Sequence, residues 1–301
     1  MRILITGTSG QVGGALRQLL SARGADELIC PPRADFDLTQ PDSLAAALDG
    51  IKPDLILNPA AYTAVDRAED EVELAMTVNG ASPGVIARWA AARGVPLLHV
   101  STDYVFDGSG ERPWREDDPV APLSAYGRSK LAGEDEIRAA GGAHLVMRTA
   151  WVFGAEGANF MRTMIRLARE RDSLRVVADQ LGTPTSARTI AEVIAAILAQ
   201  GKGDLPATFA KAGGLVHLTN GGSTSWHGFA SAIVDGLRQR DVAVKAGDVE
   251  AITTADFPTK ARRPANSRLD LSRLAVVYGI VPPTWQSALD DELAEVAPGL
   301  R

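Results

Sequence analysis

The residues with the clearest chemical potential are a tyrosine and a lysine within the segment Ser124-Ala-Tyr-Gly-Arg-Ser-Lys130. At this four-residue spacing, Tyr126 and Lys130 lie on the same face of a helix, one turn apart. A lysine ammonium beside a phenol favours the phenolate, which lowers the pKa of the tyrosine. Tyr126 could then donate or accept a proton near neutral pH, unless the pair is an ordinary surface contact. Thr102, some two dozen residues upstream, strengthens the catalytic interpretation.

A second group of residues could hold a dinucleotide. The apolar run Ile3–Ile5 predicts a buried parallel strand, and three glycines at three-residue spacing follow it before a helical pattern begins. Glycine at such a turn lets the backbone approach a pyrophosphate, which the N–H groups of the helix N-terminus can bind. An ordinary glycine-rich turn is the alternative, but this position favours a dinucleotide. We expect the cofactor to contact Gly7, Gly10, Gln11, Val12 and Gly13.

The end of the second predicted strand, Glu27–Cys30, is where dinucleotide folds carry an acidic residue for the ribose 2′-hydroxyl. No carboxylate is obvious directly after this strand. Arg33 could pair with a 2′-phosphate instead, or could be a solvated loop residue. Asp37 and Leu38 follow where a loop could hold an adenine ring, although a helix-entry turn is equally consistent. The sequence therefore predicts NADPH or NADH as the cofactor without a choice between them.

Two further segments follow predicted strands directly and should lie at the carboxyl edge of the sheet, where open α/β sheets bind ligands. Ala60, Ala61 and Tyr62 follow the strand Asp54–Asn58, and the two small residues would let a cofactor lie against the backbone. Ser101–Gly108 follows the strand Val95–Val100 and brings hydroxyl, carboxylate and aromatic groups to the same edge. This edge is the predicted active site.

The elements that must position these residues alternate between strand and helix over the first half of the chain. This alternation predicts an α/β fold with a Rossmann-like, doubly wound parallel sheet. Thr39 and Asp42 resemble a capping box at the start of one helix. After Gly182 the rhythm changes, so we expect residues 1–182 to form an NAD(P)-binding Rossmann domain. Residues 183–301 are expected to form a smaller, mixed substrate-binding lobe, with some segments returning to the first domain.

Composition excludes several classes of function. The chain has 301 residues, a net charge of −6 and 46% hydrophobic residues, which argues against wholesale binding to nucleic acid or to an anionic membrane. Cys30 is the only cysteine, and a strand begins the chain with no signal peptide ahead of it, so we expect a cytoplasmic protein. The four histidines lack metal-ligand spacing and are expected to be structural.

Taken together, the motifs resemble those of the extended short-chain dehydrogenases/reductases that act on nucleotide sugars. The shared motifs are Gly7-x-x-Gly10-x-x-Gly13, Ser101-Thr102-Asp103 and Tyr126-x-x-x-Lys130. Longer strings resemble the dTDP-4-dehydrorhamnose reductase family, and the resemblance covers essentially the whole chain. These strings are Thr6–Gly13, Asn58–Glu69, Ser101–Gly108 and Arg263–Leu269.

The resemblance implies reduction of the C4 ketone of dTDP-4-dehydro-β-L-rhamnose by NADPH or NADH. It assigns Tyr126 as the proton donor to the forming alkoxide, Lys130 as the residue that binds the nicotinamide ribose, and Thr102 as a hydrogen-bond partner of the reacting oxygen. Arg263 would face the diphosphate, which suits arginine because two anionic phosphates need forked donors. The expected substrate contacts are Thr102, Asp103, Tyr104, Val105, Trp151, Asn159 and Arg263.

Departures from the family pattern bear on metal binding and on rival activities. Some members place a glutamate just after the glycine turn, where it helps to hold magnesium between subunits, but this chain reads Gly14-Ala15. We therefore expect no metal, and a monomer or a weak homodimer. Dehydratases of this fold carry a glutamate where Tyr104 stands, which disfavours that activity. A nucleotide-sugar 4-epimerase and a non-catalytic, NADP-binding regulatory subunit remain alternatives.

Overall fold

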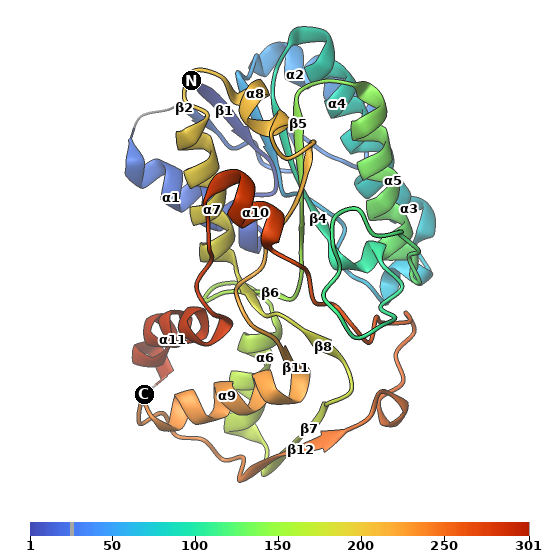
Figure 1. The fold of residues 1–301 in the computed structure, drawn as a ribbon. Helices are drawn as coiled ribbons and strands as arrows, with labels where there is room; N and C mark the ends of the chain where they lie inside the picture. The colour runs from blue at the N-terminus through green and yellow to red at the C-terminus, as the bar shows by residue number, and fades with distance from the viewer. Residues whose placement is uncertain (25–26, 301) are drawn as a thin grey trace.

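A six-stranded parallel sheet forms the centre of the protein, and the computed structural model describes residues 1–24 and 27–300 (Figure 1). Every strand pair in this sheet is parallel. Because β1 has β2 on one side and β3 on the other, the direction of winding reverses between β1 and β3, where such sheets bind ligands. The predicted doubly wound sheet is confirmed. In spatial order the strands are β10 (Leu215–His217), β5 (His144–Thr149), β4 (Leu97–Thr102), β3 (Leu55–Asn58), β1 (Arg2–Ile5) and β2 (Glu27–Ile29).

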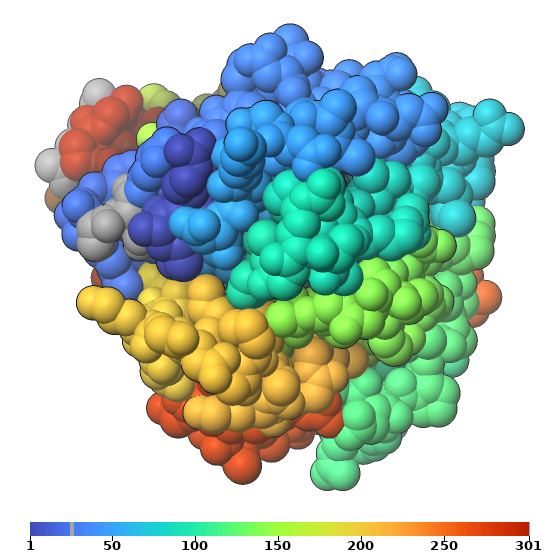
Figure 2. Space-filling model, turned by 90° about the horizontal axis from the view of Figure 1, so that it is seen from above, coloured from blue at the N-terminus to red at the C-terminus, as the bar shows by residue number. Residues whose placement is uncertain are grey.

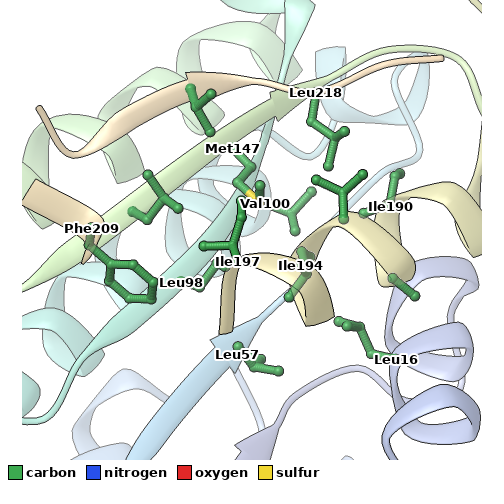
Figure 3. Close-up of a cluster of buried hydrophobic side chains, with 14 of the residues drawn as sticks. Leu16, Leu57, Leu98, Val100, Met147, Ile190, Ile194, Ile197, Phe209 and Leu218 are labelled. Carbon is green, nitrogen blue, oxygen red and sulfur yellow. The ribbon is translucent and has the colours of Figure 1, made fainter. Parts of the chain in front are cut away.

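Alternate residues of the strands pack against helices on opposite faces of the sheet. On one face, Ile3, Leu57 and Leu98 pack against four helices. Figure 3 shows part of this cluster, with Leu57 and Leu98 near Ile194 of α7. On the other face, Leu4 and Ile56 pack against three helices. The first set of helices is α1 (Gln11–Arg23), α7 (Ala187–Gln200), α8 (Leu205–Ala210) and α10 (Ser272–Tyr278); the second is α2 (Pro41–Ile51), α4 (Ser82–Arg93) and α5 (Ala125–Ala140).

A second packed region lies below the carboxyl ends of the strands (Figure 1). Its apolar core joins three helices to a parallel pair of strands. Short strand pairs, β6 (Val152–Phe153) with β9 (Thr185–Ser186) and β8 (Leu181–Gly182) with β11 (Thr224–Ser225), connect it to the sheet. The elements of the second core are α6 (Phe160–Glu170), α9 (Trp226–Arg238), α11 (Trp285–Val296), β7 (Ser173–Val177) and β12 (Asp248–Ile252).

The two packed regions interleave along the chain. α6 and β7 precede residue 182 and pack in the second region, whereas α7 and β10 follow it and pack on the sheet. The view from above shows the gold segment around α8 beside the blue N-terminal segments, so a late part of the chain lies next to the first part (Figure 2). The division of the chain into domains at residue 182 stays a prediction.

Local details differ from the sequence expectations at two helices. α2 begins at Pro41 with Gln40 as its N-cap residue, so the predicted capping box at Thr39 is wrong. The reason is that the Thr39 N–H donates to Asp37 Oδ1 at 2.9 Å, which closes a turn before the helix starts. The sequence pattern also predicts a helix over 76–93, but this range contains a π-helical turn at Thr77–Ala81, which follows the short helix α3 (Val72–Met76). Within the described ranges, no helix has the length and apolarity needed to cross a bilayer.

Candidate active site

Tyr126 and Thr102 meet at the carboxyl edge of the sheet. Thr102 ends β4, and Tyr126 stands in the first turn of α5, whose N-cap residue Ser124 accepts a hydrogen bond from the Gly127 N–H at 3.1 Å. Desolvation raises the pKa of Tyr126 to about 12, and a hydrogen bond with Thr102 partly offsets this effect. At neutral pH the phenol is therefore protonated, as a proton donor must be.

Lys130 occupies the same face of α5, as predicted, but its amine points at β4. Its Nζ donates to the Val100 carbonyl oxygen at 2.8 Å and lies 3.0 Å from His99 Nε2. The predicted lowering of the Tyr126 pKa by Lys130 is wrong for this structure, because burial dominates and raises that pKa. The lysine is only 1% exposed, and its own desolvation lowers the pKa of the amine to about 8.

The glycine turn lies beside this edge and has the shape that a dinucleotide requires. Gly7 has a φ of 60°, and its carbonyl oxygen accepts a hydrogen bond from the Gly10 N–H at 2.9 Å. A Cβ atom on Gly13 would lie 2.3 Å from that carbonyl oxygen, so only glycine allows this close packing of α1 on β1. Among the described residues, no side chain caps α1, which leaves its N-terminal N–H groups for a pyrophosphate.

The loop that carries Ala60, Ala61 and Tyr62 is held against the same edge by Asn79. The Tyr62 N–H donates to Asn79 Oδ1 at 2.8 Å, and Asn79 Nδ2 donates to the Tyr62 carbonyl oxygen at 2.9 Å. The same Nδ2 donates to Ser129 Oγ at 3.0 Å. Asn79 therefore ties the loop to α5, the helix that carries Tyr126.

The residues predicted to bind the adenosine end of the cofactor differ in exposure, from the solvent-exposed Arg33 to the buried Leu38. Arg33 is highly exposed, and its Nε lies 3.5 Å from Asp37 Oδ1. A carboxylate thus stands beside Arg33, contrary to the sequence expectation, because the turn after β2 folds back. Hydrogen bonds from Thr39 hold the pKa of Asp37 below its usual range. Leu38 packs its side chain in the core, so any contact that it makes with the cofactor would come from its backbone.

The predicted substrate residues also divide between the site and the core. Tyr104 packs edge-on against the Tyr126 ring, with the ring centroids 5.5 Å apart. Asp103 is buried, which raises its pKa to about 6, and its Oδ1 accepts a hydrogen bond from the Thr102 hydroxyl at 3.0 Å. Val105 is fully buried beside Phe106, so its side chain serves the core.

Trp151 and Asn159 join the sheet to the second region. The Trp151 ring stacks on Trp226 with centroids 3.6 Å apart. Asn159 caps α6, since its Oδ1 accepts the Arg162 N–H at 3.1 Å, and its Nδ2 lies 3.4 Å from Gln11 Oε1. The predicted cofactor residue Gln11 and the predicted substrate residue Asn159 are thus brought together.

A cavity of about 830 Å³ opens in the second region next to these residues. Arg263 lines it and also forms an ion pair with Asp66 at 2.9 Å. The walls combine apolar aromatic rings with guanidinium groups, which suits a planar base attached to an anionic group. The aromatic and cationic lining residues are Phe160, Trp226, Phe257, Arg171, Arg175 and Arg263.

Polar residues inside the strands are part of the site that sequence reasoning missed. Asn58 and His99 are fully buried beside apolar residues of their strands, and they are register partners on β3 and β4. The signal in the sequence is a polar residue next to apolar ones in a predicted strand, within it for His99 and at its end for Asn58. Over residues 1–24 and 27–300, no cluster of three or more His, Cys, Asp or Glu side chains could hold a metal ion.

Comparisons of sequence relate the chain to one family over nearly its whole length. The model of the RmlD substrate binding domain matches residues 1–297. A dTDP-4-dehydrorhamnose reductase of Burkholderia thailandensis is 45% identical over 291 residues, which are 96% of this chain and 97% of the relative. A dTDP-4-dehydrorhamnose reductase of Escherichia coli K12 is 39% identical over 300 residues, 98% of each chain.

Solved structures agree with this relation. A dTDP-4-dehydrorhamnose reductase of Clostridium acetobutylicum superimposes with a TM-score of 0.89 at 35% identity, covering 98% of this chain and 99% of that one. A Bacillus anthracis dTDP-4-dehydrorhamnose reductase, solved in complex with NADP, gives a TM-score of 0.88 at 32% identity with the same coverage.

Proposed function

This chain belongs to the RmlD substrate binding domain family, the family of the dTDP-4-dehydrorhamnose reductases, and we propose that it reduces the C4 ketone of dTDP-4-dehydro-β-L-rhamnose with NADPH or NADH. The product is dTDP-β-L-rhamnose. The observation that carries the proposal is the joint placement of Thr102 and Tyr126 at the sheet edge that also carries the glycine turn.

The cofactor, when bound, supplies the hydride, and the residues present fit it. Gly13 allows α1 to pack closely on the turn after β1, Gly7 allows that turn to pack against Ala60, and the uncapped N-terminus of α1 would bind the pyrophosphate. Lys130 of α5 would bind the nicotinamide ribose when the cofactor is present. The loop of Ala60 and Ala61, fixed by Asn79, lines the other side of the cofactor site.

Tyr126 donates the proton that neutralises the forming alkoxide at C4. Its phenol is protonated at neutral pH because desolvation raises its pKa, and an alkoxide is a strong enough base to take that proton. The Thr102 hydroxyl, which donates to Asp103 Oδ1 in this structure, would turn to donate a hydrogen bond to the same oxygen when substrate binds. A tyrosine proton makes a Lewis acid unnecessary, so we propose that the reaction needs no divalent metal.

The cavity beside Arg263 accommodates the nucleoside diphosphate of the substrate. Its aromatic rings pack against the base and its guanidinium groups pair with the phosphates. Tyr104 packs against Tyr126 and is near enough to Arg263 of the cavity for that charge to act on the pKa of its phenol, so Tyr104 would direct the sugar toward the catalytic hydroxyl. In this proposal the sheet region binds the cofactor, and the second packed region, which is built from segments on both sides of residue 182, contributes the cavity for the nucleoside diphosphate, in a cytoplasmic enzyme.

Incubation of the protein with dTDP-4-dehydrorhamnose and each reduced cofactor tests the proposal directly. Cofactor absorbance should fall in proportion to the substrate reduced, and dTDP-rhamnose should accumulate. A 4-epimerase would instead retain tightly bound NAD and consume no added cofactor. Formation of an epimer without consumption of NADPH or NADH would therefore replace the proposal.

Arg33 is expected to favour NADPH over NADH. Its guanidinium is exposed and its contact with Asp37 is long, so it is available to pair with a 2′-phosphate. Arg33→Ala should raise the KM for NADPH roughly 10-fold, the scale of one charge-assisted hydrogen bond, with little change for NADH. Steady-state kinetics with both cofactors measure this, and an equal effect on both would remove Arg33 from the 2′-phosphate site.

A further inference from the structure

We propose that His99 is a positioning residue that holds the amine of Lys130 and links it, through Asn58 and Thr6, to the turn that binds the cofactor. The importance of this link for turnover rests on the proposed role of Lys130 at the nicotinamide ribose. The link itself is a property of the protein without ligand and can be measured there.

A continuous line of polar contacts carries the inference. Lys130 Nζ lies 3.0 Å from His99 Nε2, and His99 Nδ1 lies 3.0 Å from Asn58 Nδ2. On the far side of the amide, the Thr6 hydroxyl donates to Asn58 Oδ1 at 2.7 Å. The line therefore runs from α5 through β4 and β3 to the end of β1, across the centre of the sheet.

The line ends at the cofactor turn. Thr6 immediately precedes Gly7, and Thr6 Oγ1 accepts a hydrogen bond from the Ala60 N–H at 3.2 Å. A Cβ atom on Gly7 would lie 2.9 Å from Ala60, so the two loops that border the cofactor touch at this point. A change in the Thr6 hydrogen bonds thus acts on both loops.

The side chains of this line are buried, so each of their hydrogen-bonding groups needs a partner within the protein. Thr6, Asn58, His99 and Lys130 are each at most 2% exposed, so water does not replace a lost partner. Burial and the nearby Lys130 hold the pKa of His99 well below its ordinary value, so the imidazole is neutral. A neutral imidazole has one donor and one acceptor nitrogen. The hydrogen bonds on the two sides of the His99 ring must therefore run in the same direction along the line.

The direction follows the charge of Lys130. When the amine is charged, His99 Nε2 must accept from it, so Nδ1 carries the proton and Asn58 must present its amide oxygen to the ring. When the amine is neutral, Nε2 can donate, and Nδ1 then accepts from Asn58 Nδ2 while Thr6 donates to Oδ1. The Asn58 amide has the orientation of the second arrangement, and a flip of that amide gives the first, which suits the charged amine that a pKa of about 8 implies at neutral pH.

The remaining groups around Lys130 are accounted for. Glu134, one turn further along α5, favours the charged amine and is itself paired with Arg148 of β5 at 2.6 Å. The Val100 carbonyl oxygen from β4 accepts from either form of the amine. Thr77–Ala81 faces α5 through the uncharged Asn79. His99 is therefore the titratable side chain whose tautomer must match the charge of Lys130.

The test compares His99→Leu with His99→Gln by carbon NMR of protein labelled at the lysine Cε. The chain has six lysines, the other five are exposed, and Lys130→Met identifies the signal of interest. Leucine cannot accept a hydrogen bond, so we expect the pKa of Lys130 to fall by about one unit. Glutamine keeps a neutral acceptor, so we expect the pKa to stay within a few tenths of the wild-type value.

Two controls make the result decisive. His217→Leu removes another fully buried histidine, on β10, and should leave the Lys130 pKa unchanged. If His99→Leu does not fold, His99→Met provides an apolar side chain with only a weak acceptor. An unshifted Lys130 pKa in a folded leucine or methionine variant would overturn the inference, as would an equal shift in the glutamine variant.

Binding of NADPH supplies an independent readout. In His99→Leu, the decline of affinity with rising pH should begin about one pH unit lower than in the wild type, in step with the NMR titration. Near-normal turnover in Lys130→Met would contradict the proposed catalytic role of the lysine but would leave the titration result intact. The two failures are therefore distinguishable.

Discussion

Tyr126→Phe is expected to lower kcat by roughly 10²–10⁴, the usual contribution of a general acid, with almost unchanged affinity for NADPH. The substitution removes the proton that the C4 alkoxide takes but keeps the ring, which packs edge-on against Tyr104 at 5.5 Å. Because the loss falls on an interaction made only in the transition state, kcat and kcat/KM should fall together. Stopped-flow and steady-state measurements of NADPH oxidation check this.

Tyr104→Phe is the matched control for this prediction. It removes a neighbouring buried phenol whose pKa desolvation also raises, and it keeps the packing of the two rings. Its effect on kcat should be much smaller, since Thr102 is the hydrogen-bond partner of the Tyr126 phenol. Equal losses in the two variants would show that ring packing, and not proton donation, limits the rate.

The glycine turn and the sheet could be predicted because their signals are local. Gly7, Gly10 and Gly13 stand between an apolar strand and a helical pattern, and the structure places them at that turn. The Tyr126/Lys130 spacing likewise fixed which face of α5 the pair shares. The direction of the lysine amine depends instead on how α5 packs on β4, which no local pattern contains.

Side chains near the ends of strands and helices show more clearly that a local pattern does not reveal where a side chain packs. Val105 and Leu38 follow strands or precede helices, where ligand contacts are common, yet both pack in the core. The stacking of Trp151 on Trp226 joins segments far apart in the chain, and only the tertiary fold creates it. Asn58 and His99 form their contact through strand register, which a single sequence does not reveal.

Glu134→Ala is expected to destabilise the protein by about 3–5 kcal/mol, the cost of leaving one charge of a buried pair without its partner. Glu134 and Arg148 side chains are 1% and 2% exposed, with Arg148 Nη2 and Glu134 Oε2 2.6 Å apart. The Ser101 hydroxyl also donates to Glu134 Oε1 at 2.5 Å, so the strand end that carries Thr102 loses a support. Urea unfolding monitored by circular dichroism gives the free-energy difference.

An exposed ion pair of similar geometry shows whether burial, and not ion pairing by itself, causes the loss of stability expected for Glu134→Ala. Arg166 and Glu170 lie 2.8 Å apart on α6 with more than half of each side chain exposed, so Glu170→Ala should change stability by less than about 1 kcal/mol. The double variant Glu134→Leu/Arg148→Met removes both buried charges and should recover most of the loss. If the double variant were instead as unstable as the sum of its two single variants, the unpaired charge would not be the source of the cost, and lost packing beneath β4 and β5 would explain it.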